Sequence, residues 1–253
     1  MTRLRVYPLL ETCREIPTAE MNAVALALVK LSQLVCDIAE ISEIDLDPLL
    51  ADEQGVTALN TSIKVARTAL SGAQRLAIRP YPKELEELLT LPDGLSMLLR
   101  PIRPEDEPAF HKLFARLTPE EVLLRFLNPM QALPRALAAR LTQIDYDREM
   151  ALVLEGKNPD GESELYGAVR IIADPDNERA EFAILLRGDM TGSGLGPLLL
   201  RRIIDYARNR GIGEIYGEVL SQNQAMLKLC QVFGFSARRI PDDPGVMHVS
   251  LQL

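Results

Sequence analysis

The stretch Thr191-Gly192-Ser193-Gly194-Leu195-Gly196 decides how this sequence folds. Upstream, Phe182 to Leu186 has the composition of a strand, and downstream apolar residues recur at helical spacing until Gly211 ends the pattern. The order is therefore strand, glycine loop, helix. Glycines at alternate positions let the backbone approach a ligand closely and turn several N–H groups toward it at the positive end of the helix. The stretch predicts a cradle for a pyrophosphate.

The spacing of these glycines does not identify the ligand by itself. A flexible turn produces the same pattern, and the dinucleotide fingerprint has a different third spacing. The position of the loop argues against a dinucleotide-binding fold, because its strand comes late in the chain, after a β run that looks antiparallel and without an early βαβ unit.

The first third of the chain is a separate part. A helical pattern covers residues 18–37, and Ile41 to Pro48 alternates like a half-buried strand. Val56 to Asn60 is expected to be its antiparallel return strand. Small residues and then Arg79-Pro80-Tyr81-Pro82 mark a boundary, since proline keeps the backbone extended. We therefore expect a small α+β unit over residues 1–78, a linker over 79–95 and a second α+β domain over 96–253.

The second part contains strands and short helices before the glycine loop. The expected helices begin with proline in the first turn, where its missing N–H has no partner to lose. They cover 104–117, 119–127 and 134–141, and the expected strands cover 96–102, 149–154, 164–172, 179–186 and 214–220.

Composition limits the function. With 253 residues, 47% of them hydrophobic, the chain can bury a sizeable core. Because 36 acidic residues outweigh 28 basic ones, no nucleic-acid partner is expected. There is no apolar run long enough for a membrane span, and three widely spaced cysteines fit a reducing compartment, so the predicted location is cytoplasmic. Only two histidines are present, and no metal site or Ser/His hydrolase site is predicted.

The residues around the loop resemble a known family. Strand, glycine loop and helix, followed by a strand at 215–220, Asn223, a short helix and Gly234-Phe235, resemble the GNAT acetyltransferases. Thr142 to Ala151 and Ala173 to Asn177 more closely resemble the acetyltransferase domain of bacterial Pat-type protein lysine acetyltransferases. The resemblance covers roughly 96–253. It implies the GNAT fold, which is a mixed, mostly antiparallel sheet flanked by helices, and acetyl-CoA as co-substrate.

A second resemblance lies upstream. Glu43 to Asp52 and Gly55 to Leu59 resemble the closing piece of an ATP-grasp acyl-CoA ligase subunit of the NDP-forming type, a region that precedes the acetyltransferase in Pat-type enzymes. The metal-binding Asn and Asp of that family would fall on Asp47 and Asn60, which are exchanged in type, and the sequence contains no ATP-binding lobe. ATP-dependent ligation is therefore not expected.

The GNAT resemblance also implies roles for individual residues. A lysine amine with a pKa near 10.4 is neutral in only about one molecule in 2500 at pH 7, so transfer to it needs a base. Glu181 holds the position of the family's general base. Backbone groups at Ile184, Leu185 and Leu186 are expected to hold the thioester arm, with an oxyanion donor near Leu186. Asn223 matches a residue that bonds the pantetheine, although a plain N-cap explains it equally well.

Two departures from the family keep other functions open. Thr191 stands where an Arg, Lys or Gln commonly opens the loop, and Cys230 stands where many GNAT enzymes have a tyrosine acid. A thiolate leaves easily because its pKa is near 8.5, so the missing acid is tolerable. The first expectation is acetylation of a protein lysine, for example in an acyl-CoA synthetase. The alternatives are acetylation of a small amine, such as an antibiotic or polyamine, and a non-catalytic module that senses acetyl-CoA.

Overall fold

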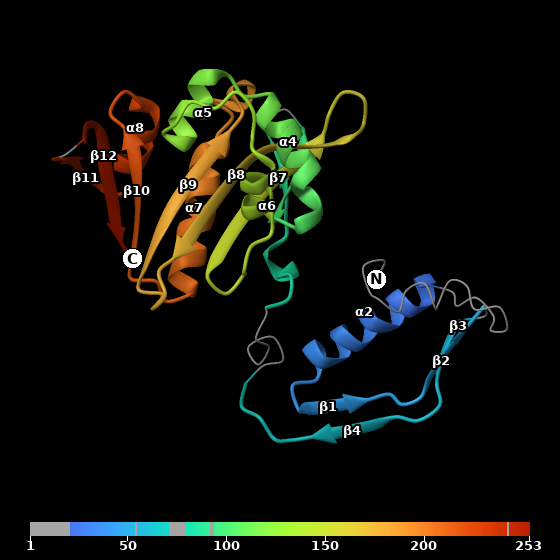
Figure 1. The fold of residues 1–253 in the computed structure, drawn as a ribbon. Coiled ribbons are helices and arrows are strands. Elements are labelled where there is room, and N and C mark those ends of the chain that lie inside the picture. The colour runs from blue at the N-terminus through green and yellow to red at the C-terminus, as the bar shows by residue number, and fades with distance from the viewer. Residues whose placement is uncertain (1–20, 54, 71–78, 92–93, 242) are drawn as a thin grey trace. The chain divides into compact units, whose positions relative to one another are not determined.

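The computed structural model describes residues 21–53, 55–70, 79–91, 94–241 and 243–253 (Figure 1). The chain divides into two compact units, with the division between Pro80 and Tyr81. Residues 18–20 of the first expected helix lie outside the described residues. This division lies within the segment Arg79-Pro80-Tyr81-Pro82.

The described residues of the N-terminal unit form one helix and two pairs of short strands. Helix α2 is Met21–Asp37, and the strands are β1 (Ile41–Asp45), β2 (Leu49–Asp52), β3 (Gly55–Ala58) and β4 (Ser62–Val65). The return strand expected for β1 was placed wrongly. β3 pairs with β2, whereas β1 pairs antiparallel with β4, because the chain makes an inner hairpin before it returns.

The C-terminal unit is built on one eight-stranded sheet with the order β11-β12-β10-β9-β8-β7-β6-β5. All neighbours are antiparallel except β9 and β10, which are parallel, so the sheet is mixed and mostly antiparallel, as the resemblance implies. Its strands are β5 (Glu87–Thr90), β6 (Ser96–Pro101), β7 (Glu149–Lys157), β8 (Ser163–Ala173), β9 (Arg179–Leu186), β10 (Glu214–Leu220), β11 (Ser236–Ile240) and β12 (Asp243–Gln252).

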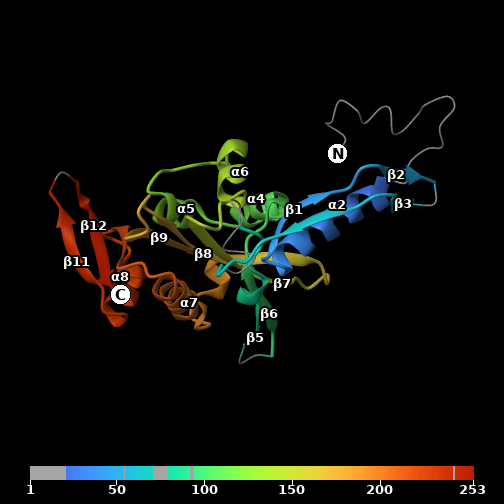
Figure 2. The same ribbon diagram turned by 90° about the horizontal axis from the view of Figure 1, so that it is seen from below.

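Helices lie on both sides of this sheet (Figure 2). One side carries α4 (Glu107–Ala115), α5 (Pro119–Phe126) and α6 (Arg135–Thr142), and the other carries α7 (Leu195–Asn209) and α8 (Gln224–Val232). Short 3-10 turns, η1 (Lys83–Leu85), η2 (Pro104–Asp106) and η3 (Gly188–Met190), precede β5, α4 and the glycine loop.

Alternation along the central strands divides the core into two layers. In β7, Met150, Leu152 and Leu154 face α7, whereas Ala151 and Val153 face α4 and its neighbours. A sheet covered on both faces needs apolar residues at nearly every position, and β7 and β8 have them. The buried side chains of α7 that complete the first layer are Leu195, Leu199, Leu200, Ile203, Ile204 and Ala207.

Two parts of the sheet were not expected from the sequence. β5 falls within residues 79–95, the range expected to be a linker, yet it pairs antiparallel with β6 and forms one edge of the sheet. The hairpin of β11 and β12 forms the other edge, beside β10.

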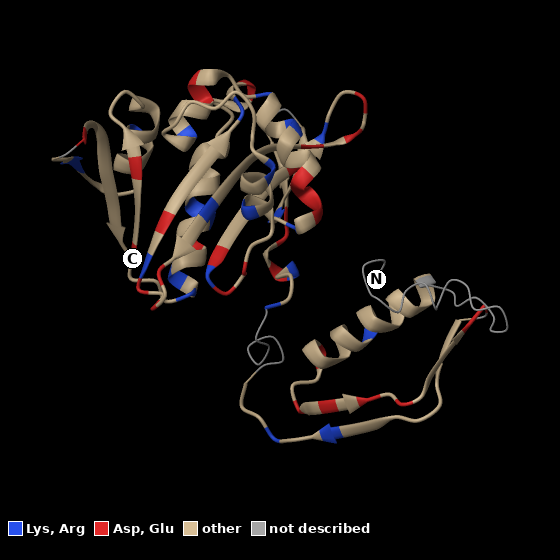
Figure 3. Cartoon of the chain, viewed as in Figure 1, with Lys and Arg blue, Asp and Glu red and all other residues tan. Residues whose placement is uncertain are grey.

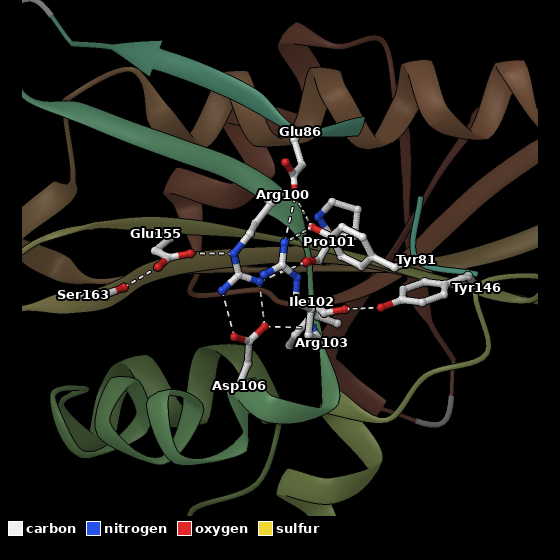
Figure 4. A network of polar contacts seen from close by, with 10 residues as sticks. All are labelled: Tyr81, Glu86, Arg100, Pro101, Ile102, Arg103, Asp106, Tyr146, Glu155 and Ser163. Atoms are coloured by element: carbon white, nitrogen blue, oxygen red, sulfur yellow. Dashed lines mark hydrogen bonds and ion pairs between the residues drawn. The ribbon is translucent and has the colours of Figure 1, made fainter. Parts of the chain in front are cut away.

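A polar network fastens β6 to the start of the helical layer (Figure 4). Arg100 and Asp106, both buried, form a two-pronged ion pair with N···O distances of 2.8 Å. Arg100 also donates to Glu155, which accepts from Ser163 as well. Burial alone would lower the pKa of Arg100, but the bonds to Asp106 and Glu155 raise it above its ordinary value. At the side of this pair, Arg103 reaches Tyr81 and Glu86.

We expect Asp106→Ala to lower the free energy of unfolding by about 3–5 kcal/mol, because two buried N–H groups of Arg100 lose their charged acceptor and the guanidinium keeps only Glu155 as an ion-pair partner. Urea unfolding of the C-terminal unit measures the loss. Asp205→Ala is the matched control, because its 4.0 Å pair with Arg208 is exposed and is worth less than about 1 kcal/mol. Equal losses in the two variants would contradict a structural role for the buried pair.

Candidate active site

The site begins where β9 and β10 separate. Their parallel pairing ends at Tyr216 and Glu181, although both strands continue beyond this point. Gly217 lies at the point of separation. A Cβ atom there would meet the carbonyl oxygen of Phe182 at 3.1 Å and its ring at 3.0 Å. The glycine therefore lets β10 pass close to β9 before the two strands diverge, which opens a wedge in the middle of the sheet.

Separation leaves backbone groups of β9 available inside the wedge. The backbone N–H of Arg187 donates to the carbonyl oxygen of Tyr166 on β8, with an N···O distance of 3.1 Å. The pairing of β8 and β9 keeps one register from Ala180 to Leu186, so alternate residues direct their amide groups to opposite edges of the strand. The amide groups of Ile184 and Leu186 consequently face the side of β10, where no strand pairs with them.

Two cavities meet at this wedge. One, of about 300 Å³, is lined by α5, β9 and β10. The other, of about 560 Å³, is lined by the glycine loop and by the start of α7 and α8. Ile184, Leu186, Asn223 and Met226 line both cavities. Because α5 and α7 lie on opposite sides of the sheet, the two cavities form one cleft that passes between β9 and β10.

The glycine loop surrounds one end of the larger cavity. Gly192 and Gly194 have φ angles of +84° and +83°, in the left-handed region where only glycine is unstrained. Thr191, Gly192, Gly194 and Gly196 all line the cavity. Among the described residues, the N–H groups of Gly192, Gly194 and Gly196 have no backbone acceptor. These donors lie at the positive end of the 15-residue helix α7, where an anion is stabilised.

Two predicted loop residues line neither cavity. The Ser193 hydroxyl donates to the carbonyl oxygen of Met190 within the loop. Leu195 is 1% exposed and packs in the core. Their side chains therefore hold the shape of the loop, and only their backbone groups are available to a ligand.

A basic residue that was not predicted from the sequence lines the same cavity as the loop. Lys228, on α8, is exposed and lines the same cavity as Thr191. The cation that a GNAT resemblance places at position 191 therefore has a counterpart from a different helix. No spacing in the sequence connects Lys228 with the loop, because α8 follows one strand later in the chain.

The smaller cavity is lined mainly by acidic and apolar residues. Glu181 is exposed and lines its wall together with Glu121 and Glu218. Figure 3 shows the acidic positions on β9 and β10 and the acidic start of α5. One guanidinium, that of Arg125 near the end of α5, lines the same cavity. The position that the sequence predicts for the base therefore lies beside the wedge, on the side of the sheet opposite the glycine loop.

Comparison with known proteins identifies the family. Residues 96–236 match the family model described as the acetyltransferase (GNAT) domain, which is more than half of the chain. The chain belongs to the GNAT acetyltransferases. Residues 1–65 match the model of the ATP-grasp domain, in agreement with the resemblance at 43–59. The chain is thus a GNAT acetyltransferase domain preceded by an ATP-grasp-like segment.

Individual relatives agree with this assignment. Acetyltransferase PA5475 of Pseudomonas aeruginosa is 36% identical over 154 residues, which cover 61% of this chain and 82% of that protein. The GNAT domain of PAT from S. lividans superposes with a TM-score of 0.61 at 27% identity, covering 69% of this chain and all of that domain. RimL, a ribosomal L7/L12 alpha-N-protein acetyltransferase solved with coenzyme A, matches the fold with a TM-score of 0.51 at 16% identity, over 66% of this chain and 98% of RimL.

GNAT acetyltransferases use acetyl-CoA, and the cleft fits this molecule. The loop offers free N–H groups for phosphates, and apolar residues of α8 such as Met226 and Leu229 line the continuation of the cavity toward the wedge. Asn223 caps α8, because its Oδ1 accepts from the N–H of Met226 at 3.1 Å. Since the same residue lines the cavity, the N-cap and a contact with the pantetheine are compatible.

The residue at the family's tyrosine position is not suited to proton transfer. Cys230 is 1% exposed and packs with the α7 layer. Burial raises the pKa of its thiol to about 12. Cys230 also lines neither of the two cavities, so the chain has a packing residue here in place of an acid.

Among the described residues, no helix is both long and apolar enough to cross a membrane.

Proposed function

We propose that this GNAT domain transfers the acetyl group of acetyl-CoA to the side-chain amine of a protein lysine, with Glu181 as the general base. The observation that carries the proposal is the cleft through the sheet, with phosphate donors at one mouth and Glu181 at the other. The likeness to the S. lividans PAT domain, at 27% identity over its whole length, supports a protein acceptor.

The acidic lining of the smaller cavity supports a cationic acceptor. Three carboxylates lie there against one guanidinium, so the site attracts an ammonium group before transfer. Glu181 then takes a proton from that ammonium, directly or through one water, and leaves a neutral amine next to the thioester. A positioned base of this kind contributes about 10²- to 10⁴-fold to the rate.

Backbone groups of β9 are suited to the next step. When the amine attacks the thioester carbonyl, negative charge develops on its oxygen. The N–H of Leu186, which has no strand partner on the side of β10, is the donor that we assign to this oxyanion. The departing thiolate needs no strong acid because its pKa is near 8.5, which agrees with the buried Cys230.

The proposal is tested by binding and transfer measured together. Calorimetry is expected to show that acetyl-CoA binds one site per chain, and mass spectrometry is expected to show one acetyl group added to a peptide that contains a single lysine. The matched control is the same peptide with arginine in place of lysine, which keeps the charge but has no acceptor amine. Transfer to small amines alone would exclude the protein acceptor, and binding without any transfer would support a sensor.

A further inference from the structure

Two arginines lie together beside the smaller cavity, which is called the acceptor-side cavity below because Glu181 lines it. Arg125, near the C-terminal end of α5, and Arg170, in the middle of β8, line the same small recess. Their positive charges disfavour each other. Burial, and then the charge of Arg170, lower the pKa of Arg125 to about 10, and the opposing effect of Glu181 is smaller. Burial also lowers the pKa of Arg170.

Neither guanidinium has a full set of partners among the described residues. Arg170 is 7% exposed and bonds to Glu149 through Nη2, but its Nε is buried without any acceptor. Arg125 has no hydrogen bond and no ion pair within the described ranges, and its one polar contact is with the ring of Phe126, at 4.9 Å from the centroid. The buried Nε of Arg170 is a cationic donor without an acceptor, which is costly, and the half-buried Arg125 lies beside it at the cavity wall. This pair indicates that an acceptor arrives with a ligand.

The recess between the two arginines is sized for a single oxygen. Its volume is about 10 Å³, which is close to the smallest space that holds one water molecule. It is continuous with the acceptor-side cavity, because Arg125, Ala183 and Leu185 line both. Its other walls are apolar, formed by Ile102, Phe110, Leu141, Ala151 and Ala168. Arg125 and Arg170 are thus the charged residues among those that line the recess, and the remaining lining residues are apolar.

The proposed base lies on the same face of the sheet. Ile172 pairs with Glu181 and Arg170 pairs with Ala183, so alternation places the side chains of Glu181 and Arg170 on one face. Among the described residues, no ion pair joins Glu181 to Arg125 or to Arg170. Glu121, the α5 carboxylate that lines the cavity, is held by the capping box with Thr118. Among the described residues, Glu181, Glu218 and Arg125 therefore line the cavity without ion pairs between them.

We propose that Arg125, supported by Arg170, binds a carboxylate of the acceptor, so that the preferred substrates carry an acidic group close to the amine that is acetylated. This inference rests on the proposed acetyl transfer with Glu181 as base. The anion is assigned to the acceptor and not to coenzyme A, because the phosphate donors of the glycine loop line the other cavity, on the opposite side of the sheet.

Matched peptides test this proposal. Each contains one lysine and blocked ends, with one Glu placed at successive positions around the lysine, and a twin peptide has Gln in place of Glu. For the best position, kcat/KM is expected to be about 10- to 100-fold higher with Glu than with Gln, the effect of one charge-assisted hydrogen bond. Arg125→Met is expected to reduce this ratio to about one.

Two further variants separate binding from a structural effect. Arg125→Lys keeps the charge but loses the two-pronged geometry, so it should retain part of the preference. Arg140, on α6, is an exposed residue whose charge acts on Arg170 but which does not line the cavity. Arg140→Met should therefore retain the full preference for Glu over Gln. An unchanged Glu-to-Gln ratio in Arg125→Met would overturn the inference. An equal loss of kcat/KM with the Glu and the Gln peptide would also overturn it, and this result is expected if the recess holds only a structural water.

A second pair of acceptors separates this inference from the proposed function. Free lysine and cadaverine differ only by the carboxylate. If no peptide is acetylated but free lysine reacts at least 10-fold better than cadaverine, the protein acceptor is wrong and the role of Arg125 stands. If the two small amines react equally well and no Glu position is preferred in a peptide, the role of Arg125 is wrong whether or not peptides are substrates. Turnover of none of these acceptors would overturn both proposals.

Discussion

Glu181→Gln is expected to lower kcat by about 10²- to 10⁴-fold and to leave the affinity for acetyl-CoA unchanged. The amide cannot take the proton of the ammonium group, so the small neutral fraction of a lysine, about one in 2500 at pH 7, becomes the only reactive form. Affinity is preserved because Glu181 lines only the acceptor side of the cleft. Steady-state rates with saturating acetyl-CoA and calorimetry of the same variant check both parts.

The control for this variant is Glu178→Gln. Glu178 is also exposed, lies three residues earlier and lines neither cavity. It makes the same change of charge near β9 without touching the cleft, so its kcat should equal that of the unmodified chain. A normal kcat in Glu181→Gln would remove Glu181 from the mechanism. A weaker affinity for acetyl-CoA in that variant would show that the change disturbs the wedge.

Gly194→Glu is expected to weaken acetyl-CoA binding by on the order of 10²- to 10³-fold. Gly194 has a φ angle of +83°, and a Cβ atom there would meet nothing within 4 Å, so the new side chain causes no clash with the protein. It would occupy the mouth of the cradle, where a carboxylate about 4 Å from one phosphate charge is repelled by about 4 kcal/mol at a partly exposed site. Calorimetric titration with acetyl-CoA measures the loss.

Gly211→Glu is a closely matched control for this effect. Gly211 lies at the other end of α7, has a φ angle of +77° and also has nothing within 4 Å of a built Cβ. The two variants therefore introduce the same residue into the same backbone conformation, and only one faces the cavity. Equal affinities for acetyl-CoA in both variants would refute the cradle. Gly194→Ala, which adds strain without charge, should lie between the unmodified chain and Gly194→Glu.

The order of elements around the glycine loop could be predicted because each has a local signal. β9 is an apolar run, the loop alternates glycines, and α7 repeats buried residues at helical spacing. The loop marks a helix start in any fold, and the residues on either side of it carry the resemblance to the GNAT family. The relation between β9 and β10 could not be predicted, since their separation depends on a contact between Gly217 and Phe182.

The edges of the sheet were missed because edge strands lack the pattern of buried ones. In β11 the five residues are almost all exposed, and Arg238 and Arg239 interrupt any alternation. β5 has only four residues, and Leu88 is 72% exposed. Short, charged or solvent-facing strands are common at edges because they discourage pairing with other chains. Their amino-acid pattern is that of a loop.

Some residues of the site could be predicted from a local motif, whereas others could not. Glu181 and the glycine loop are close in sequence and follow one another along the chain, so a motif can include both. Arg125, Arg170 and Lys228 come from three elements that the sheet brings to the cleft. From the sequence alone, a helix residue such as Arg125 looks like an ordinary surface charge, because only the fold shows which residues it faces. Long-range assembly, and not local pattern, supplies these contacts.

The wedge between β9 and β10 affects the paths by which the donor and the acceptor enter and leave the cleft. Because its two mouths open on opposite sides of one sheet, donor and acceptor need not use the same path. In the proposed reaction, a folded protein acceptor could remain against one mouth while coenzyme A is exchanged at the other. The exchange of the small donor would then be separate in space from the recognition of the acceptor.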